Sequence, residues 1–192
     1  MDLQESLSQW LTPPSVAAAF WQWSRVSPGD VVLEPAAGVG ALIPLGRSGV
    51  LAFELDPERA AELRYWRPDA TVVCGDFLAL PVPGHHVADV AVSNPPYNDA
   101  GEGTFIERAL HWAPRVCALV RTSALHGGER FEVCWSSVAL TRIAYFKNRP
   151  KFLGPMGLTT KFTPAYDYVA LEAVRRQSTL PDKPEVTWVS WR

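Results

Sequence analysis

The sequence has few cysteines, no long apolar run and no signal-like start. Its three cysteines, Cys74, Cys117 and Cys134, are widely spaced, so they form neither a zinc-binding spacing nor a disulfide framework and are typical of reduced thiols. No apolar run is long enough to cross a bilayer. The acidic, polar segment 1–5 is unlike a secretory signal. These absences predict a cytoplasmic protein with no membrane partner and no metal site.

Excess charge is also lacking, but the charges are unevenly distributed. The formal net charge is −2, which by itself argues weakly against nucleic acid as a partner. Segment 133–166 nevertheless contains no Asp or Glu. Its basic residues are Arg142, Lys147, Arg149, Lys151 and Lys161. The chain therefore carries one basic segment on an otherwise acidic body.

Residues 147–162 lack a hydrophobic period and contain proline and glycine, which predicts a long loop, and long loops are usually functional. Phe152 and Phe162 are interleaved with Lys147, Arg149, Lys151 and Lys161. Such a mixture suits phosphate contacts and base stacking. A solvated loop without a ligand is an equal alternative.

A length of 192 residues allows one domain with a substantial core. Apolar runs alternate with helical patterns, which is typical of α/β proteins with a mostly parallel sheet. Strands are expected near 31–33, 49–53, 71–74, 89–93, 115–120, 138–146 and 164–173. Helices are expected near 3–11, 16–23 with Ser15 as N-cap, 58–66, 105–112 and within 127–135, with a loop over 99–104. Residues 1–176 would form the domain, and the tail 177–192 would add an edge strand over 185–191.

The stretch from Asp89 to Asn98 combines a buried strand with an unusual exit. Small β-forming residues run into Asn94-Pro95-Pro96-Tyr97, and the prolines force the chain to leave the sheet as a stiff loop. Open α/β sheets bind ligands beyond the carboxyl ends of their strands. We therefore expect this loop to border a ligand site, although a proline-stiffened turn with an exposed aromatic would have the same sequence.

The loop offers a specific chemistry to an amine. The Asn94 side-chain oxygen and the Pro95 carbonyl could each accept an N–H hydrogen bond from an exocyclic amine or an amide. These bonds would favour a pyramidal nitrogen and stabilise the positive charge that develops as it attacks a methyl group. The ring of Tyr97 supplies a face for a planar group to stack on.

A glycine-rich turn follows the first expected strand, in the sequence from Glu34 to Leu42. Small residues allow the backbone to approach a ligand, and a helix expected after the turn would present its mildly positive N-terminus. Such a turn by itself is common. Glu34 is more informative, because an acid would repel a pyrophosphate and attract the ammonium of an amino-acid moiety. The turn therefore favours S-adenosylmethionine over a dinucleotide.

The next two strands also end on acids. Glu54 follows the second strand, where a carboxylate can hold both ribose hydroxyls of a nucleoside. Asp56 precedes Pro57 and is expected to cap the following helix. After the third strand, Asp76 could accept from an adenine amino group while Phe77 packs on the ring, although a plain strand-exit turn would look the same.

Together these segments form a known pattern that spans nearly the whole chain. They are, in order, Thr12-Pro13-Pro14, Glu34-Pro35-Ala36-Ala37-Gly38-Val39-Gly40, Glu54-Leu55-Asp56-Pro57, Gly75-Asp76-Phe77 and Asn94-Pro95-Pro96-Tyr97. The pattern resembles the S-adenosylmethionine-dependent amino-methyltransferases, and among them the adenine-N6 DNA methyltransferases. The later segments 149–152 and 166–168 are similar to a compact phage and prophage subgroup. The combination is specific, whereas no single motif is.

The resemblance implies a fold and a set of roles. The fold would be a single Rossmann-like class I domain with a mostly parallel seven-stranded sheet and an antiparallel last strand. S-adenosylmethionine would be bound by Thr12, Pro13, Glu34, Ala36, Gly38, Gly40, Glu54, Asp76, Phe77 and Asn94. Asn94, Pro95, Pro96 and Tyr97 would receive a target adenine flipped out of its strand.

One departure from this family leaves the substrate open. Larger relatives carry a separate target-recognition domain, for which this chain has no room. Recognition would then come from the 147–162 loop, from a dimer mate or from a specificity partner. Single-stranded DNA or RNA is a further substrate to consider, as is cytosine N4 methylation. A protein methyltransferase acting on glutamine amides would use a similar Asn-Pro-Pro-Tyr site, and a non-catalytic binding protein would keep only the fold.

Overall fold

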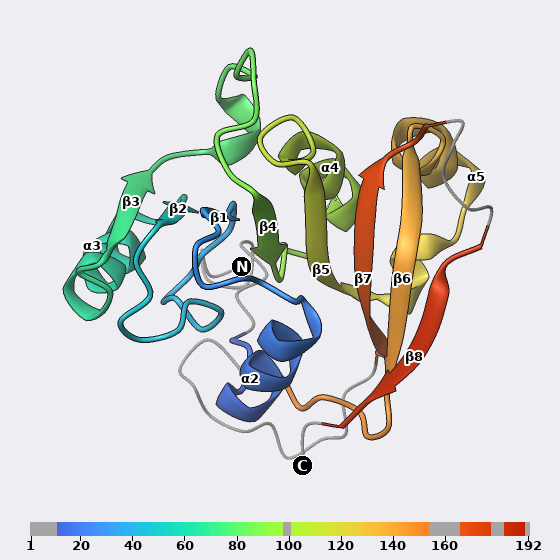
Figure 1. Ribbon diagram of the computed structural model, residues 1–192, viewed down its shortest axis with the longest axis horizontal. Helices are drawn as coiled ribbons and strands as arrows, with labels where there is room; N and C mark the ends of the chain where they lie inside the picture. The colour runs from blue at the N-terminus through green and yellow to red at the C-terminus, as the bar shows by residue number, and fades with distance from the viewer. Residues whose placement is uncertain (1–10, 98–100, 154–165, 178–182, 191–192) are drawn as a thin grey trace, which may run out of the picture.

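The computed structural model describes residues 11–97, 101–153, 166–177 and 183–190. Within them a single sheet has the strand order β3-β2-β1-β4-β5-β7-β6-β8 (Figure 1). The strands are β1 (Val32–Glu34), β2 (Val50–Glu54), β3 (Ala70–Cys74), β4 (Val90–Ser93), β5 (Arg115–Arg121), β6 (Val138–Phe146), β7 (Tyr168–Arg175) and β8 (Glu185–Val189). The order places the carboxyl ends of β1 and β4 side by side at the centre of the sheet, where open α/β sheets bind ligands.

Strand β7 is the antiparallel member of the sheet. It pairs antiparallel with both β5 and β6, as expected for the stretch near 164–173. The sheet has eight described strands rather than the seven expected, because residues 185–189 pair in parallel with β6 at the edge. The possible edge strand in the tail is therefore the eighth strand. A register shift between Leu140 and Arg142 marks an irregularity in β6.

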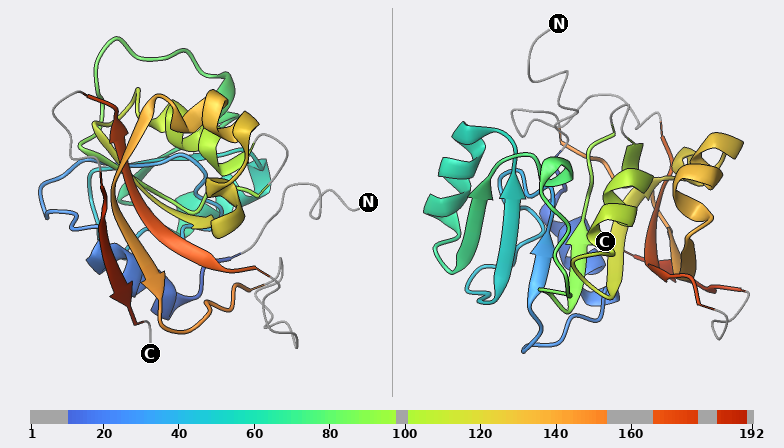
Figure 2. Two further views of the ribbon diagram at one scale, coloured as in Figure 1. Left: turned by 90° about the vertical axis from the view of Figure 1, so that its right-hand side faces the viewer. Right: turned by 90° about the horizontal axis from the view of Figure 1, so that it is seen from above.

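Helices cover both faces of the sheet. They are α2 (Pro14–Trp23), α3 (Pro57–Trp66), α4 (Gly101–Ala109) and α5 (Gly128–Arg130), with 3₁₀ turns η1 (Phe77–Ala79) and η2 (Thr122–Leu125) and a π-helical turn η3 (Phe131–Trp135). Figure 2 shows α2 and α4 on opposite faces. One core cluster joins Phe20 of α2 and Leu63 of α3 to the sheet, and the other joins Ile106 of α4 to the sheet's second face.

Several helix boundaries differ from the expectations. Helix α2 begins at Pro14 with Pro13 at the N-cap position, so the expected Ser15 cap is wrong, because proline's fixed φ already suits the first helical turn. Helix α4 begins at Gly101, so the loop expected over 99–104 is wrong over residues 101–104. The helix expected near 3–11 falls largely on residues 1–10, outside the described residues. No described helix is long and apolar enough to cross a membrane.

The glycine-rich turn is not followed by a helix. Residues 35–49 contain turns and bends but no helical segment, and the chain passes from them directly into β2. The expected helix N-terminus at this turn is therefore wrong. Its absence removes a source of positive potential from the carboxyl end of β1.

Candidate active site

A cavity of about 310 Å³ lies at the carboxyl ends of β1, β2 and β4. Its volume lies at the small end of the range of about 300–1,000 Å³ that is usual for ligand pockets. The segments that line it are far apart in the sequence but end at one edge of the sheet. From the residues predicted to bind a cofactor or carry catalysis, its lining includes Thr12, Glu34, Ala36, Gly38, Glu54, Asp76, Phe77, Asn94 and Pro96.

Two residues predicted to bind the cofactor do not line the cavity. The carbonyl of Pro13 accepts from the Ala17 N–H at 2.9 Å in the first turn of α2. Gly40 packs on α3 instead, with φ of +81° and so little space that an added Cβ would lie 2.5 Å from a Leu63 methyl carbon. Pro13 therefore starts a helix and Gly40 allows the turn to approach α3, so the structure gives both residues a role in the fold, and their contacts with the cofactor stay predictions.

Glu34 is a buried acid at the end of β1, with only 2% of its surface exposed. One of its oxygens accepts from the Ala36 N–H at 3.3 Å. Burial raises its pKa well above the usual value, against hydrogen bonds from Ser93 and Ala36 that lower it. No basic side chain of the described residues forms an ion pair with Glu34. A cation that entered the cavity would therefore find an uncompensated acid.

Glu54 and Asp76 hold turns of the chain as well as lining the cavity. The Glu54 carboxylate accepts from the Gly38 N–H at 2.6 Å and the Asp56 N–H at 2.8 Å, which fixes the glycine turn against β2. Each carboxylate oxygen keeps a further lone pair for a ligand. Asp76 accepts from the Leu78 N–H at 2.9 Å and so caps the short turn η1. Asp56 caps α3, as expected.

Phe77 is buried within an aromatic cluster at the end of the cavity. Its ring centroid lies 5.3 Å from that of Phe53, 5.4 Å from Trp112 and 6.4 Å from Phe105. Phe105 also lines the cavity, as do Leu55 and Leu78, none of which the sequence predicted as site residues. Leu55 directly follows Glu54 and Leu78 directly follows Phe77, both predicted site residues, so adjacency was an available signal, whereas Phe105 comes from α4 and gave none.

Asn94 is held by both ends of its amide. Its amide nitrogen donates to the Thr12 hydroxyl at 3.1 Å, and its oxygen accepts from the Tyr97 hydroxyl. Thr12 is itself buried. The amide lines an open cavity, and its orientation is fixed by two segments of the chain. An amide oxygen has a second lone pair, so it can accept from an incoming amine as well.

The ring of Tyr97 is enclosed more than the sequence indicated. The guanidinium carbon of Arg121 lies 4.9 Å from its centroid, and the rings of Tyr168 and Phe152 lie at 5.5 and 6.5 Å. Burial raises the pKa of the Tyr97 hydroxyl well above its usual value, so the group stays a neutral donor to Asn94. A stacking partner would therefore have to share the ring with Arg121.

Arg121 and Glu102 form an ion pair beside this loop that the sequence did not predict. The Arg121 side chain donates to both Glu102 oxygens, at 2.8 and 3.3 Å. Glu102 is 2% exposed, and it lies in the part of the chain that was expected to form a loop. The pair joins the end of β5 to the start of α4 and holds the cation against Tyr97.

Comparisons with solved structures identify the fold. The chain is 18% identical to a Pyrococcus horikoshii protein assigned as an RNA methyltransferase, with a TM-score of 0.67 over 92% of this chain and 91% of that one. The M protein of the type I restriction enzyme EcoKI also gives 0.67, at 14% identity over 92% of this chain and 46% of that one. A dimethyladenosine transferase from Plasmodium falciparum gives 0.57, at 15% identity over 88% and 64%. No protein-family model and no curated protein matches the sequence.

The fold is that of a class I methyltransferase. Leu153, within the 147–162 segment, lies beside the cavity of this methyltransferase fold, because it exchanges two backbone hydrogen bonds of 2.9 Å with Leu11, which lines the cavity. Lys147, Arg149 and Lys151 are exposed, and Arg149 forms an ion pair with Asp167 at 2.6 Å.

Phe152 corrects one part of the prediction for the basic segment. It is 4% exposed, and its centroid lies 4.4 Å from that of Tyr168. The expectation that it stacks on a base is therefore wrong, because the ring belongs to the core beneath Tyr97. Lys161 and Phe162 lie outside the described residues.

Proposed function

We propose that this chain is an S-adenosylmethionine-dependent methyltransferase that methylates the N6 amine of adenine in nucleic acid, with DNA as the first choice. The observation that supports this most directly is the position of Asn94. Its amide lies at the start of a proline-stiffened loop and lines the same cavity as Glu34 and Glu54. A site that can accept N–H groups thus borders a site suited to a cationic nucleoside.

The residues of the cavity fit the cofactor group by group. Glu34, buried without a cation, would pair with the ammonium group, and Glu54 would bind the ribose hydroxyls through its remaining lone pairs. Asp76 would accept from the adenine amine beside Phe77. When bound, S-adenosylmethionine supplies an electrophilic methyl group on a sulfonium.

Asn94 and Pro95 would act on the acceptor amine. Hydrogen bonds from the amine to the Asn94 side-chain oxygen and the Pro95 carbonyl would turn its lone pair toward the methyl carbon. The new N–C bond would form as the C–S bond breaks, and the methylated amine would then lose a proton to water. Thr12 and Tyr97 keep the Asn94 amide oriented throughout. The target base must leave its stack to reach this position.

A transfer assay with a radioactive methyl group tests the proposal. The acceptors are single-stranded DNA, duplex DNA and RNA oligonucleotides with and without adenine, alongside protein acceptors. Digestion to nucleosides then identifies the methylated base. We expect label in N6-methyladenosine or its deoxy form. Label in protein alone would instead support glutamine N5 methylation, and label in cytosine would support the N4 reaction, so either result contradicts the proposal.

The Asn94→Ala variant tests the role of the amide in the same assay. We expect the rate to fall about 100- to 1,000-fold, as when one preorganised polar group is removed from a developing charge. Binding of S-adenosylhomocysteine, measured by calorimetry, should change only a few-fold. A variant that keeps its rate would show that the Asn94 amide takes no part in the reaction.

If a dimer mate or a specificity partner supplies recognition, its addition should raise the rate of the unaltered chain.

A further inference from the structure

The glycine turn of this protein lacks a feature that would favour an anion. No helix follows it, since residues 35–49 form turns and bends only. A helix N-terminus carries roughly half a positive charge and exposed N–H groups. The amino-acid moiety of the proposed cofactor carries a carboxylate as well as an ammonium group. That carboxylate therefore needs another positive partner.

The charges that line the cavity are unequal in number. Its acids are Glu34, Glu54 and Asp76, and its basic side chain among the described residues is Arg59. Arg59 lies in the first turn of α3, where its N–H donates to the capping Asp56 carboxylate at 3.4 Å. A Cβ built on Gly38 would lie 3.9 Å from an Arg59 guanidinium nitrogen. The guanidinium therefore lies next to the glycine turn.

Arg59 differs in its contacts from Arg64 of α3 and from Arg67, the residue that caps the end of α3. Arg67 donates to the carbonyls of Ile43 at 2.8 Å and Gly40 at 3.2 Å, and Arg64 donates to the Val72 carbonyl at 3.1 Å. Their donors are used by the fold. The Arg59 guanidinium forms no hydrogen bond or ion pair with any described residue, although the side chain is half-buried. Its donors remain available to a ligand.

We propose that Arg59 binds the carboxylate of the cofactor's amino-acid moiety and replaces the missing helix N-terminus. A guanidinium matches a carboxylate with two parallel N–H···O bonds, which are among the stronger hydrogen bonds in proteins. Glu34 and Arg59 would then hold the ammonium and the carboxylate of one zwitterion. This inference rests on the proposed cofactor but not on the identity of the methyl acceptor.

Truncated ligands test this assignment without a substrate. S-adenosylhomocysteine carries the amino-acid moiety, whereas 5′-methylthioadenosine has the same nucleoside and sulfur without it. In calorimetry, Arg59→Gln should weaken S-adenosylhomocysteine about 10- to 100-fold, the loss usual for a hydrogen-bonded charge. Its affinity for 5′-methylthioadenosine should stay within about twofold of the unaltered protein. Arg59→Lys should recover part of the lost affinity, because lysine keeps the positive charge but not the paired N–H donors of the guanidinium.

Arg64→Gln is the matched control, since it makes the same chemical change on the same helix outside the cavity. It should leave both affinities unchanged, and circular dichroism should show that all three variants are folded. If Arg59→Gln weakened the binding of both ligands equally, or of neither, the assignment of Arg59 would be overturned while the proposed cofactor would stand. If the unaltered protein bound neither ligand, the proposed cofactor would fail and the assignment with it.

Discussion

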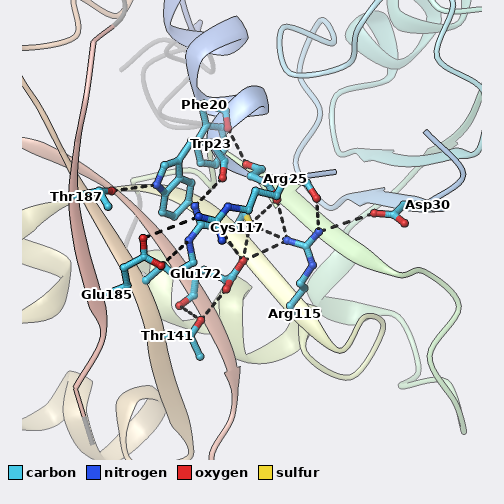
Figure 3. A network of polar contacts seen from close by, with 12 residues as sticks. Phe20, Trp23, Arg25, Asp30, Arg115, Cys117, Thr141, Glu172, Glu185 and Thr187 are labelled. Carbon is cyan, nitrogen blue, oxygen red and sulfur yellow. Dashed lines mark hydrogen bonds and ion pairs between the residues drawn. The ribbon is translucent and has the colours of Figure 1, made fainter. Parts of the chain in front are cut away.

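Charged side chains are used differently in the cavity and at the amino end of strand β5. In the cavity, Glu34 is buried and Arg59 half-buried, each without an ion-pair partner among the described residues. At the amino end of β5, Arg115, Arg142 and Glu172 form a network in which opposite charges meet (Figure 3). The same kinds of side chain thus serve two purposes. Charges with an ion-pair partner stabilise the fold, whereas charges without one are available to a ligand.

The network at the amino end joins α2 to the second half of the sheet. Glu172 of β7 accepts from Arg115 at 3.2 Å, from Arg142 at 3.3 Å and from the Thr141 hydroxyl at 2.8 Å. The two arginines also donate to carbonyls at the end of α2, those of Ser24 and Trp23, each at 2.8 Å. Sequence segments more than 90 residues apart are thereby tied together.

Cys117 shows how closed this end is. Its thiol lies near the Glu172 carboxylate, 3.8 Å away, and burial raises its pKa to about 12. At neutral pH the group is a thiol rather than a reactive thiolate. A closed network of this kind stabilises the fold, whereas the open cavity keeps unpaired charges for a ligand.

The largest effect we expect comes from removing the centre of the network. Glu172→Ala leaves Arg115 and Arg142 without their shared acid, and breaking a buried ion pair costs about 3–5 kcal/mol. Because Glu172 is partly exposed, we expect a loss of about 3 kcal/mol in the free energy of unfolding, measured by urea denaturation. The affinity of the remaining folded protein for S-adenosylhomocysteine should be unchanged. A strong loss of affinity in folded protein would mean that the cavity and the network are not independent.

The converse change removes an unpaired acid from the cavity. Glu34→Gln keeps the shape of the side chain but not its charge, so the affinity for S-adenosylhomocysteine should fall about tenfold, as for one lost charged hydrogen bond. The affinity for 5′-methylthioadenosine should not change. Glu62→Gln, on the exposed face of α3, is the control for both ligands.

The difference in stability between the Glu34→Gln variant and the unaltered protein should also depend on pH in a defined direction. The raised pKa of Glu34 means that the folded protein favours its protonated form. The contribution of Glu34 to the free energy of unfolding is fully present below the unfolded-state pKa of about 4.3. This contribution is lost as the pH rises through the folded-state pKa. In urea denaturation, the variant should therefore gain stability relative to the unaltered protein as the pH rises above this unfolded-state value. A difference that does not vary with pH would contradict the burial of a charged group there.

The acids of the cavity could be predicted because each lies at or just after the end of a strand. Glu34, Glu54 and Asp76 end up together for the simple reason that parallel strands end at one edge of a sheet. Arg59 and the Glu102–Arg121 pair could not be predicted in this way. Arg59 reaches the glycine turn only because α3 packs against Gly40, a tertiary contact that has no local signal.

Phe152 shows the opposite failure. Its position among basic residues indicated a surface role, yet it is buried against Tyr168. A loop without hydrophobic periodicity gives no sign of which single residue turns inward. The edge strand β8 was open to prediction, since Val186 and Trp188 alternate with polar residues, but its parallel pairing with β6 depends on the whole sheet.

The smallest effect we expect extends the comparison to the protein surface. Lys151 is exposed and has no ion-pair partner among the described residues, whereas Arg149 is paired with Asp167. If the segment binds nucleic acid, Lys151→Gln should weaken binding of a single-stranded oligonucleotide a few-fold and reduce the salt dependence by about 0.7 in log–log slope. Arg149→Gln should change the slope less, because its charge is already partly neutralised. Fluorescence anisotropy over a salt series measures the affinity and the slope for both variants. Equal slopes would mean that the ion pair with Asp167 leaves the charge of Arg149 available to nucleic acid, unlike the charges paired in the network at the amino end of β5.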